Sequence, residues 1–340
     1  MDIQELNRIA NAMVAKGKGI LAADESSGTI KKRFDAINVE NIESNRRDYR
    51  EMMFRTAGAM KDHISGVILF DETIRQKAKD GTPLVKLIEA AGSVPGIKVD
   101  AGAKPLAGSP GEVVTEGLDG LRERFQDYHK LGARFAKWRA VIDIGAKMPS
   151  YNCINANAHA LARYAALAQE NGIVPIVEPE VLMDGDHTLA RCEEVTTATL
   201  DTVFSVLFEH RVVLETMLLK TGMVLSGKTC REQAGVENVA EATIRCLRRT
   251  VPAAVPGVVF LSGGQTDVAA TERLNAICRT SAPWKLSFSY GRALQDAAMK
   301  IWRGASEKIP AAQAALHHRA RCNGRAVQGK YSAALETASA

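Results

Sequence analysis

The chain contains no uninterrupted apolar run of the ~18 residues that a membrane-spanning helix needs, although 46% of its 340 residues are hydrophobic. Its six cysteines include no C-x-x-C pair, which favours reduced thiols over a disulfide framework. Its seven histidines show no zinc-ligand spacing, so we expect no metal site. The first residues lack the basic end and apolar core of a secretion signal, which predicts a cytoplasmic protein without a membrane partner.

The sequence also lacks a linker rich in Pro, Gly or Ser, so we expect one domain over residues 1–340. Apolar residues at helical spacing predict an N-terminal helix within residues 1–17, and a C-terminal helix and tail fill residues 304–340. The net charge of +5 is mild. Basic clusters such as "HHRAR" are read as solvated helix faces, because no aromatic-interleaved basic motif marks a nucleic-acid partner.

Short β-rich runs alternate with helix-period segments along the whole chain. Helical segments such as "NAHALARYAALAQENG" and "VENVAEATIRCLRRTVP" end in Gly or Pro, as helices commonly do. The alternation predicts an α/β protein with a parallel sheet. The count of runs matches a closed (β/α)8 TIM barrel, and an open doubly wound sheet is the alternative. The predicted strands are 19–24, 66–71, 96–100, 135–139, 172–178, 212–220, 257–262 and 285–290.

Charged residues gather at the C-terminal ends of these runs. Because side chains alternate across a strand, charges at i and i+2 share one face, as in "FAKWR", "VEPE" and "GIKVD". The strand ends of a barrel converge on one rim, where barrel enzymes place their sites. The sequence therefore predicts a charged site at that rim, built from Asp24, Lys98, Asp100, Lys137, Arg139, Glu178, Glu180 and Lys220.

Two glycine-rich stretches close the last strands, "LSGGQ" at 261–265 and "SYGRAL" at 289–294. Backbone amides exposed by glycines bind anions, and the N-terminus of a helix adds favourable partial charge. Arg292 adds a fork of donors. The loops after strands seven and eight are the usual phosphate site of this barrel class, so these stretches predict a phosphate pocket.

The stretch "LLKTGMVLSGKT" offers two candidate lysines. Gly222 to Thr229 spells a P-loop with Lys228 as its phosphate lysine, which would make the protein a nucleotide hydrolase. A P-loop lysine opens a helix directly, but here the next helical pattern begins near Glu237. Lys220 instead ends an apolar run, where a buried reactive amine is expected. We therefore favour Lys220 as the nucleophile and expect Lys228 to be a solvated surface charge.

Several motifs together carry a family resemblance. The sequence contains "ILAADES", "GIKVD", "FAKWR", "IVPIVEPE", "LLK", "FLSGGQ" and "FSYGRALQ" in one register. In these the chain resembles class I (Schiff-base) fructose-bisphosphate aldolases. The resemblance implies a TIM barrel, a lyase without metal or cofactor, and reversible cleavage of fructose 1,6-bisphosphate to two triose phosphates in glycolysis and gluconeogenesis. It also implies a homo-oligomer, with a tetramer possible.

The resemblance assigns roles to matching residues. Lys220 would form the imine, Glu178 would assist dehydration of the carbinolamine, and Asp24 would handle the proton of the C4 hydroxyl. Lys137, Arg139 and Glu180 complete the implied catalytic set. The implied pocket for the ketose 1-phosphate contains Ser262, Gly263, Gly264, Ser289, Gly291 and Arg292. Positions implied near the other phosphate are Ser26, Thr29, Lys32, Arg33 and Lys98.

The chain also departs from the family pattern. Thr221 and Gly222 follow Lys220, where many members have Pro-Asn. Many animal members end in a tyrosine that assists turnover, whereas the last tyrosine here is Tyr331, for which we expect packing or anchoring. The preference for fructose over sedoheptulose bisphosphate stays open, because one hydroxymethylene is weakly discriminated.

Overall fold

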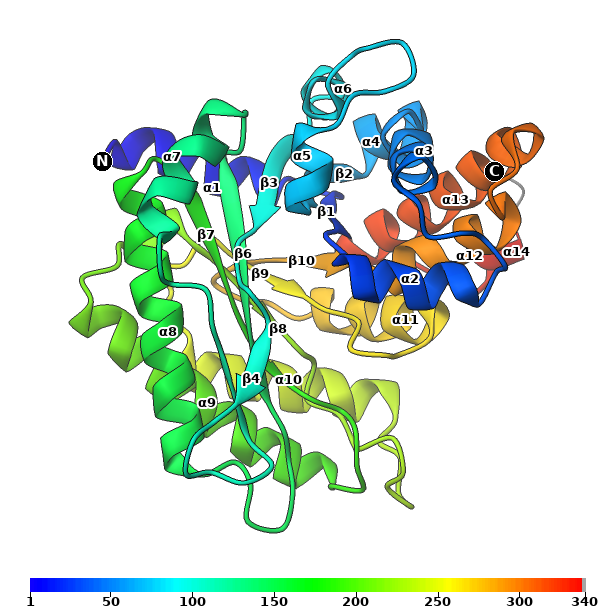
Figure 1. Cartoon of the computed structure of the whole chain (residues 1–340). Coiled ribbons are helices and arrows are strands. Elements are labelled where there is room, and N and C mark those ends of the chain that lie inside the picture. The colour runs from blue at the N-terminus through cyan, green and yellow to red at the C-terminus, as the bar shows by residue number, and fades with distance from the viewer. Residues whose placement is uncertain (338–340) are drawn as a thin grey trace.

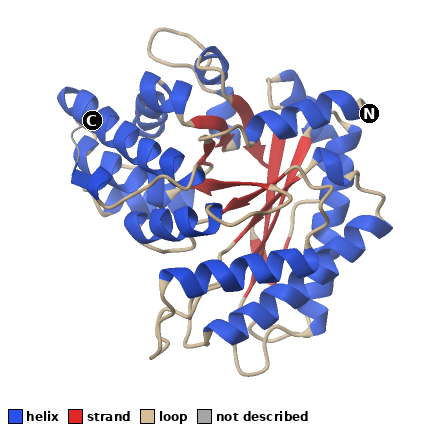
Figure 2. Ribbon diagram, turned by 180° about the vertical axis from the view of Figure 1, so that it is seen from behind, coloured by secondary structure: helices blue, strands red, loops and turns tan. Residues whose placement is uncertain are grey.

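The strands close into a barrel. The computed structural model describes residues 1–337, and within them eight parallel strands follow the order β1-β10-β9-β8-β7-β6-β3-β2 around the ring. Figure 2 shows the strands enclosed by helices, as the sequence predicted for a (β/α)8 barrel. The strands span β1 Gly19–Ala23, β2 Ile64–Leu69, β3 Val94–Lys98, β6 Phe135–Ile142, β7 Val174–Val181, β8 Leu218–Thr221, β9 Gly257–Phe260 and β10 Lys285–Tyr290.

Helices cover the outside of this ring (Figure 1). Every helix of residues 1–337 is too short or too polar to cross a bilayer. The helices are α1 Ile3–Met13, α2 Ser27–Asp35, α3 Glu43–Phe54, α4 Ala57–Asp62, α5 Asp71–Arg75, α6 Leu84–Ala90, α7 Leu121–Lys130, α8 Tyr151–Glu170, α9 Leu189–Glu209, α10 Val236–Thr250, α11 Asp267–Cys278, α12 Arg292–Trp302, α13 Ile309–Val327 and α14 Ala334–Thr337, with short 3-10 turns at Leu214–Thr216 and Ser306–Lys308.

Two parts of the prediction were wrong in detail. The predicted strand 212–220 is a strand only from Leu218, because the side chain of Gln169 bonds the backbone N–H and C=O of Val213 and takes the place of a neighbouring strand. A small antiparallel hairpin, β4 Ala103–Pro105 and β5 Val113–Thr115, was not predicted. Each of its strands is three residues long, too short to show a period of two.

The interior of the barrel changes from apolar to charged along its axis. Buried apolar side chains fill the N-terminal half, and α1 packs its buried face against this same cluster. Alternation along β6 places Phe135 in the apolar half, and Lys137 and Arg139 beyond it. The same alternation on β7 runs from Ile176 to Glu178 and Glu180. The apolar half therefore excludes water from beneath the charged half.

The two ends of the chain are held against the barrel. The expected N-terminal helix is α1, and α13 and α14 lie in the predicted C-terminal segment, of which residues 338–340 lie outside the described part. Tyr331 is buried, its N–H donates to Asn275 and its hydroxyl donates to Glu336 at 2.7 Å. Tyr331 thus anchors the start of the tail, as the sequence predicted.

Gly96 provides a test of the packing beneath the site. A Cβ on Gly96 would lie 2.3 Å from the ring of Phe135, which fills the barrel interior beneath the charged layer. We expect Gly96→Ala to lower the free energy of unfolding by about 1–3 kcal/mol, because the ring has to move within a packed core. Denaturation by urea measures this as a lower midpoint.

The matched control is Gly28→Ala in α2, where a Cβ meets nothing within 4 Å. That change should leave stability equal or raise it by about 0.5–1 kcal/mol, because alanine favours a helix. Equal midpoints for Gly96→Ala and wild type would contradict the packing described here.

Candidate active site

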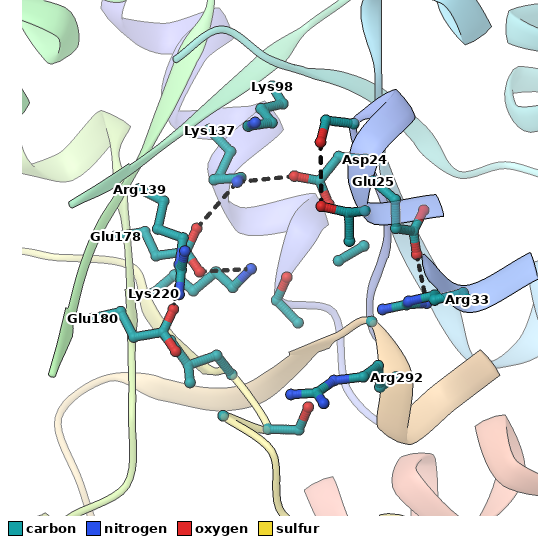
Figure 3. Close-up of a pocket in the computed structure, with 18 residues that line it drawn as sticks. Asp24, Glu25, Arg33, Lys98, Lys137, Arg139, Glu178, Glu180, Lys220 and Arg292 are labelled. Atoms are coloured by element: carbon teal, nitrogen blue, oxygen red, sulfur yellow. Dashed lines mark hydrogen bonds and ion pairs between the residues drawn. The ribbon is translucent and has the colours of Figure 1, made fainter. Parts of the chain in front are cut away.

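A charged pocket of about 250 Å³ opens at the C-terminal ends of the strands. Its lining combines acids, bases and glycine-rich loops from most of the strands (Figure 3). The residues that line it are Ala22, Asp24, Glu25, Ser26, Thr29, Arg33, Lys98, Lys137, Arg139, Glu178, Glu180, Lys220, Leu261, Ser262, Gly263, Ser289, Gly291 and Arg292. Fifteen of these were predicted, so the structure brings most of the predicted set into one cavity.

Lys220 and Lys137 share one buried glutamate. The ammonium of Lys220 lies 3.0 Å from Oε1 of Glu178, and that of Lys137 lies 3.4 Å from Oε2. All three side chains are at most 6% exposed. Glu178 is therefore placed to exchange a proton with a group bound at Lys220, while Lys137 holds the other carboxylate oxygen.

Lys137 is itself surrounded by carboxylates. Its Nζ lies 2.8 Å from Asp24 and 3.8 Å from Asp100, in addition to Glu178. Burial alone would lower the pKa of Lys137, but the three carboxylates outweigh it and raise the pKa well above its usual value. Lys137 is a fixed positive charge at neutral pH, so it serves as an electrostatic element of the site.

Asp24 is half-buried yet ionised. Burial favours the protonated acid and would raise the pKa of Asp24, but the ammonium groups of Lys137, Lys220 and Lys98 outweigh burial and hold the pKa well below its usual range. Figure 3 shows Asp24 facing Lys137 across the mouth of the barrel. Asp24 is therefore a carboxylate that can accept a proton from a bound hydroxyl.

The two glutamates of "VEPE" have different partners. Glu178 contacts two lysines, whereas Glu180 accepts a hydrogen bond from Nε of Arg139. The charge of Glu180 helps to raise the pKa of Arg139 against the opposing effect of burial. The two carboxylates share a face of β7, as predicted, but only Glu178 lies within ion-pair distance of Lys220.

The loops after β9 and β10 form a surface whose geometry suits an anion, which we call the phosphate cradle. It consists of Ser262, Gly263, Gly264, Ser289, Gly291 and Arg292. Gly263 and Gly264 have φ of +56° and +90°, a conformation that exposes successive backbone amides and that other residues rarely adopt. Ser289 Oγ is buried and has no hydrogen-bond partner within residues 1–337. Arg292 begins α12 and likewise has no ion-pair partner among them.

A second cluster of polar groups lies beside β1 and α2. Ser26 and Thr29 are hydrogen bonded to each other at 3.2 Å, and Arg33 lies 2.8 Å from Glu25. Figure 3 shows Lys98 and Arg292 projecting from different sides of the pocket. Lys32 is exposed on α2 and does not line the pocket. The predicted residues of this cluster thus include one that the structure leaves outside.

The structure adds Glu25 and Arg50 to the site and gives contacts to Asp100, which was predicted at the rim without a role. Glu25 bridges Arg33 and the buried Arg50, which also donates to the carbonyl of Ala23 at 3.0 Å. Asp100 accepts from the N–H of Arg139 and lies 3.3 Å from Lys98. Asp100 was predicted at the rim, and Glu25 follows Asp24 directly in the sequence, so its position was a usable signal. Arg50 comes from α3, and no local pattern connects it to β1.

Lys228 lies in a loop and lacks the setting of a P-loop lysine. No helix follows Thr229 directly, and α10 begins only at Val236. Lys228 is 43% exposed and forms an ion pair of 2.8 Å with Asp184. The nucleotide-hydrolase alternative therefore has no structural support at this loop.

One cluster in residues 1–337 has the ligand spacing of a metal site, formed by His318, Cys322 and Glu336. Both carboxylate oxygens of Glu336 accept hydrogen bonds from Arg319, and Tyr331 donates to one of them. None of these residues lines the pocket. The cluster is accounted for as an anchor of the C-terminal segment.

Comparison with known proteins identifies the family. Residues 5–340 match the family model described as fructose-bisphosphate aldolase class-I. The chain is 59% identical over 333 residues to a probable fructose-bisphosphate aldolase class 1 of Xanthomonas axonopodis pv. citri, covering 97% of this chain and 99% of the relative. It is 54% identical to a cytosolic fructose-bisphosphate aldolase of Arabidopsis thaliana, covering 95% and 91%.

A solved structure agrees with this result. Fructose-bisphosphate aldolase from Plasmodium falciparum, in complex with TRAP and a small molecule inhibitor, superimposes with a TM-score of 0.95 at 47% identity. The match covers 97% of this chain and 96% of that one. The sequence, the barrel and the charged rim therefore lead to one conclusion. This chain is a member of the class I fructose-bisphosphate aldolase family.

Proposed function

We propose that this pocket carries out the reversible cleavage of fructose 1,6-bisphosphate to dihydroxyacetone phosphate and glyceraldehyde 3-phosphate through an imine on Lys220. The observation that carries the proposal is the buried contact of 3.0 Å between Lys220 and Glu178 at the end of β8. It places an amine nucleophile beside a group that can transfer protons, as covalent catalysis by a lysine requires. The phosphate cradle on one side and the basic cluster on the other suit a substrate phosphorylated at both ends.

The first half of the reaction activates the ketone. Lys220 first passes a proton to Glu178 across their contact of 3.0 Å, and its neutral amine attacks C2 of the substrate to give a carbinolamine. Glu178 then returns that proton to the C2 hydroxyl, which leaves as water, and the C2=N double bond forms. Lys137 remains positively charged and stabilises the carboxylate that Glu178 becomes.

The second half breaks the bond between C3 and C4. Asp24 accepts the proton of the C4 hydroxyl, C4 becomes the aldehyde carbon of glyceraldehyde 3-phosphate, and the electron pair of the bond moves through C2 to the imine nitrogen. The resulting enamine takes a proton at C3. Water then hydrolyses the imine, which releases dihydroxyacetone phosphate and restores Lys220.

Two further predictions accompany this proposal. The word cytosolic in the name of the Arabidopsis relative supports our expectation of a cytoplasmic enzyme. The homo-oligomer, with a tetramer possible, stays a prediction that sedimentation velocity would test.

Substitution of Lys220 tests the nucleophile. We expect Lys220→Met to reduce kcat for cleavage of fructose 1,6-bisphosphate by at least about 10⁴-fold, because covalent activation of the ketone is lost. A coupled assay of triose phosphate release measures the rate, with sedoheptulose bisphosphate as a second substrate. A chelator should leave the wild-type rate unchanged.

Lys104→Met is the matched control, because Lys104 is exposed on β4 and lies outside the pocket. It should cleave at the wild-type rate. A Lys220→Met protein that keeps most of its activity, or a wild-type enzyme inactivated by chelator, would overturn the imine mechanism.

Lys137 should control the pH at which Asp24 becomes an effective base. Lys137→Met removes the nearest cation, so burial then raises the pKa of Asp24 and its protonated form persists to higher pH. The acid limb of the residual kcat/KM profile should move up by about one pH unit or more. Lys98→Met should shift the limb less, since Lys98 has the smallest effect of the three lysines on Asp24. An unmoved limb in Lys137→Met would contradict this account of Asp24.

A further inference from the structure

The loops after β7 and β8 are joined by backbone hydrogen bonds. The N–H of Gly227 donates to the carbonyl of His187, that of Lys228 to Met183, and that of Thr229 to Gly185. A Cβ on Gly227 would lie 2.4 Å from the carbonyl oxygen of Gly185, so the approach of the two loops requires glycine there. These contacts fix the backbone of Lys228 at the rim that carries the pocket.

The side chain of Lys228 then extends to the loop after β9. The position of a Cβ on Gly264 would be 3.1 Å from Nζ of Lys228 and 3.3 Å from Nη2 of Arg292. Both cations therefore lie against one glycine of the phosphate cradle, where a larger residue would require them to shift by a few tenths of an ångström. Four consecutive strand ends contribute to this arrangement, with Asp184 after β7, Lys228 after β8, Gly264 after β9 and Arg292 after β10.

The charges at this point are unbalanced. Arg292 has no ion-pair partner within residues 1–337. Lys228 has Asp184, but this pair is 43% and 60% exposed, and exposed ion pairs contribute little and exchange readily. Two cations beside one amide-lined loop form a stable arrangement when an anion lies between them. A phosphate dianion carries more charge than the carboxylate of Asp184 and competes with it for Lys228.

We propose that Lys228 is a second cation of the phosphate cradle, which exchanges Asp184 for the phosphate of dihydroxyacetone phosphate and sets the affinity for that half of the substrate. This inference rests on the proposed function, because it assigns the cradle to the ketose 1-phosphate. Asp184 has the role of a competitor that holds Lys228 near the cradle when no phosphate is bound. The P-loop spelling around Lys228 is thus a coincidence of sequence, while the lysine itself binds phosphate.

The condensation reaction tests this assignment, because each of its two substrates carries one phosphate. We expect Lys228→Met to raise KM for dihydroxyacetone phosphate by about 3- to 10-fold, the range for a partly exposed charge-assisted contact. KM for glyceraldehyde 3-phosphate should change by less than about twofold, because its phosphate binds away from Lys228. The change in kcat should be smaller than the change in KM for dihydroxyacetone phosphate.

Asp184→Asn provides a variant with the opposite sign. It releases Lys228, so KM for dihydroxyacetone phosphate should fall about two- to threefold, and this gain should vanish in the double variant with Lys228→Met. If the ion pair only stabilised the loops, both single variants would raise KM, and that result overturns the proposal. An unchanged KM in Lys228→Met, or an equal rise for both substrates, also overturns it and leaves the proposed function intact. A wild-type enzyme that forms no fructose 1,6-bisphosphate would instead remove the proposed function itself.

Discussion

A chain of ion pairs at the mouth of the barrel organises the site. Glu178 stands between two lysines, with contacts of 3.0 Å to Lys220 and 3.4 Å to Lys137, and Lys137 continues the chain to Asp24 at 2.8 Å. Buried charges persist only where partners offset the loss of water. Each of these groups is therefore held in place by the others. The same chain gives the site an amine, a proton carrier and an ionised carboxylate within one small cavity.

The barrel makes such a cluster possible because one half of its interior is apolar and the other half is charged. Below the cluster, Phe135 packs over Gly96 and the apolar interior continues into α1. Above it, the strand ends open into loops that include the phosphate cradle. The apolar half supplies stability through burial of surface, while the charged half costs stability that the packing offsets. The chemistry and the fold are thus separated along the barrel axis.

Much of this arrangement could be predicted from the sequence, for physical reasons. The period of two on β6 and β7 placed Lys137, Arg139, Glu178 and Glu180 on one inner face, and strand ends of a barrel share one rim. The family resemblance of the motifs gave the expected roles of these residues.

Local sequence patterns did not predict contacts between distant segments. Arg50 reaches Glu25 from α3, and Gln169 replaces a strand neighbour at Val213, and neither contact leaves a periodic signal. Lys228 was expected to be a solvated charge, and its position against Gly264 depends on how three loops meet.

Reduction of the imine shows directly which lysine is the nucleophile. Borohydride added in the presence of dihydroxyacetone phosphate should inactivate the enzyme irreversibly and attach the triose phosphate to one lysine. Trypsin normally cuts after Lys220, so a modified Lys220 should yield an uncut peptide of residues 212–228 that contains both candidate lysines. Fragment spectra then distinguish them. We expect the added mass on Lys220. The mass on Lys228, on another peptide or on none would rule out Lys220 as the residue that forms the imine.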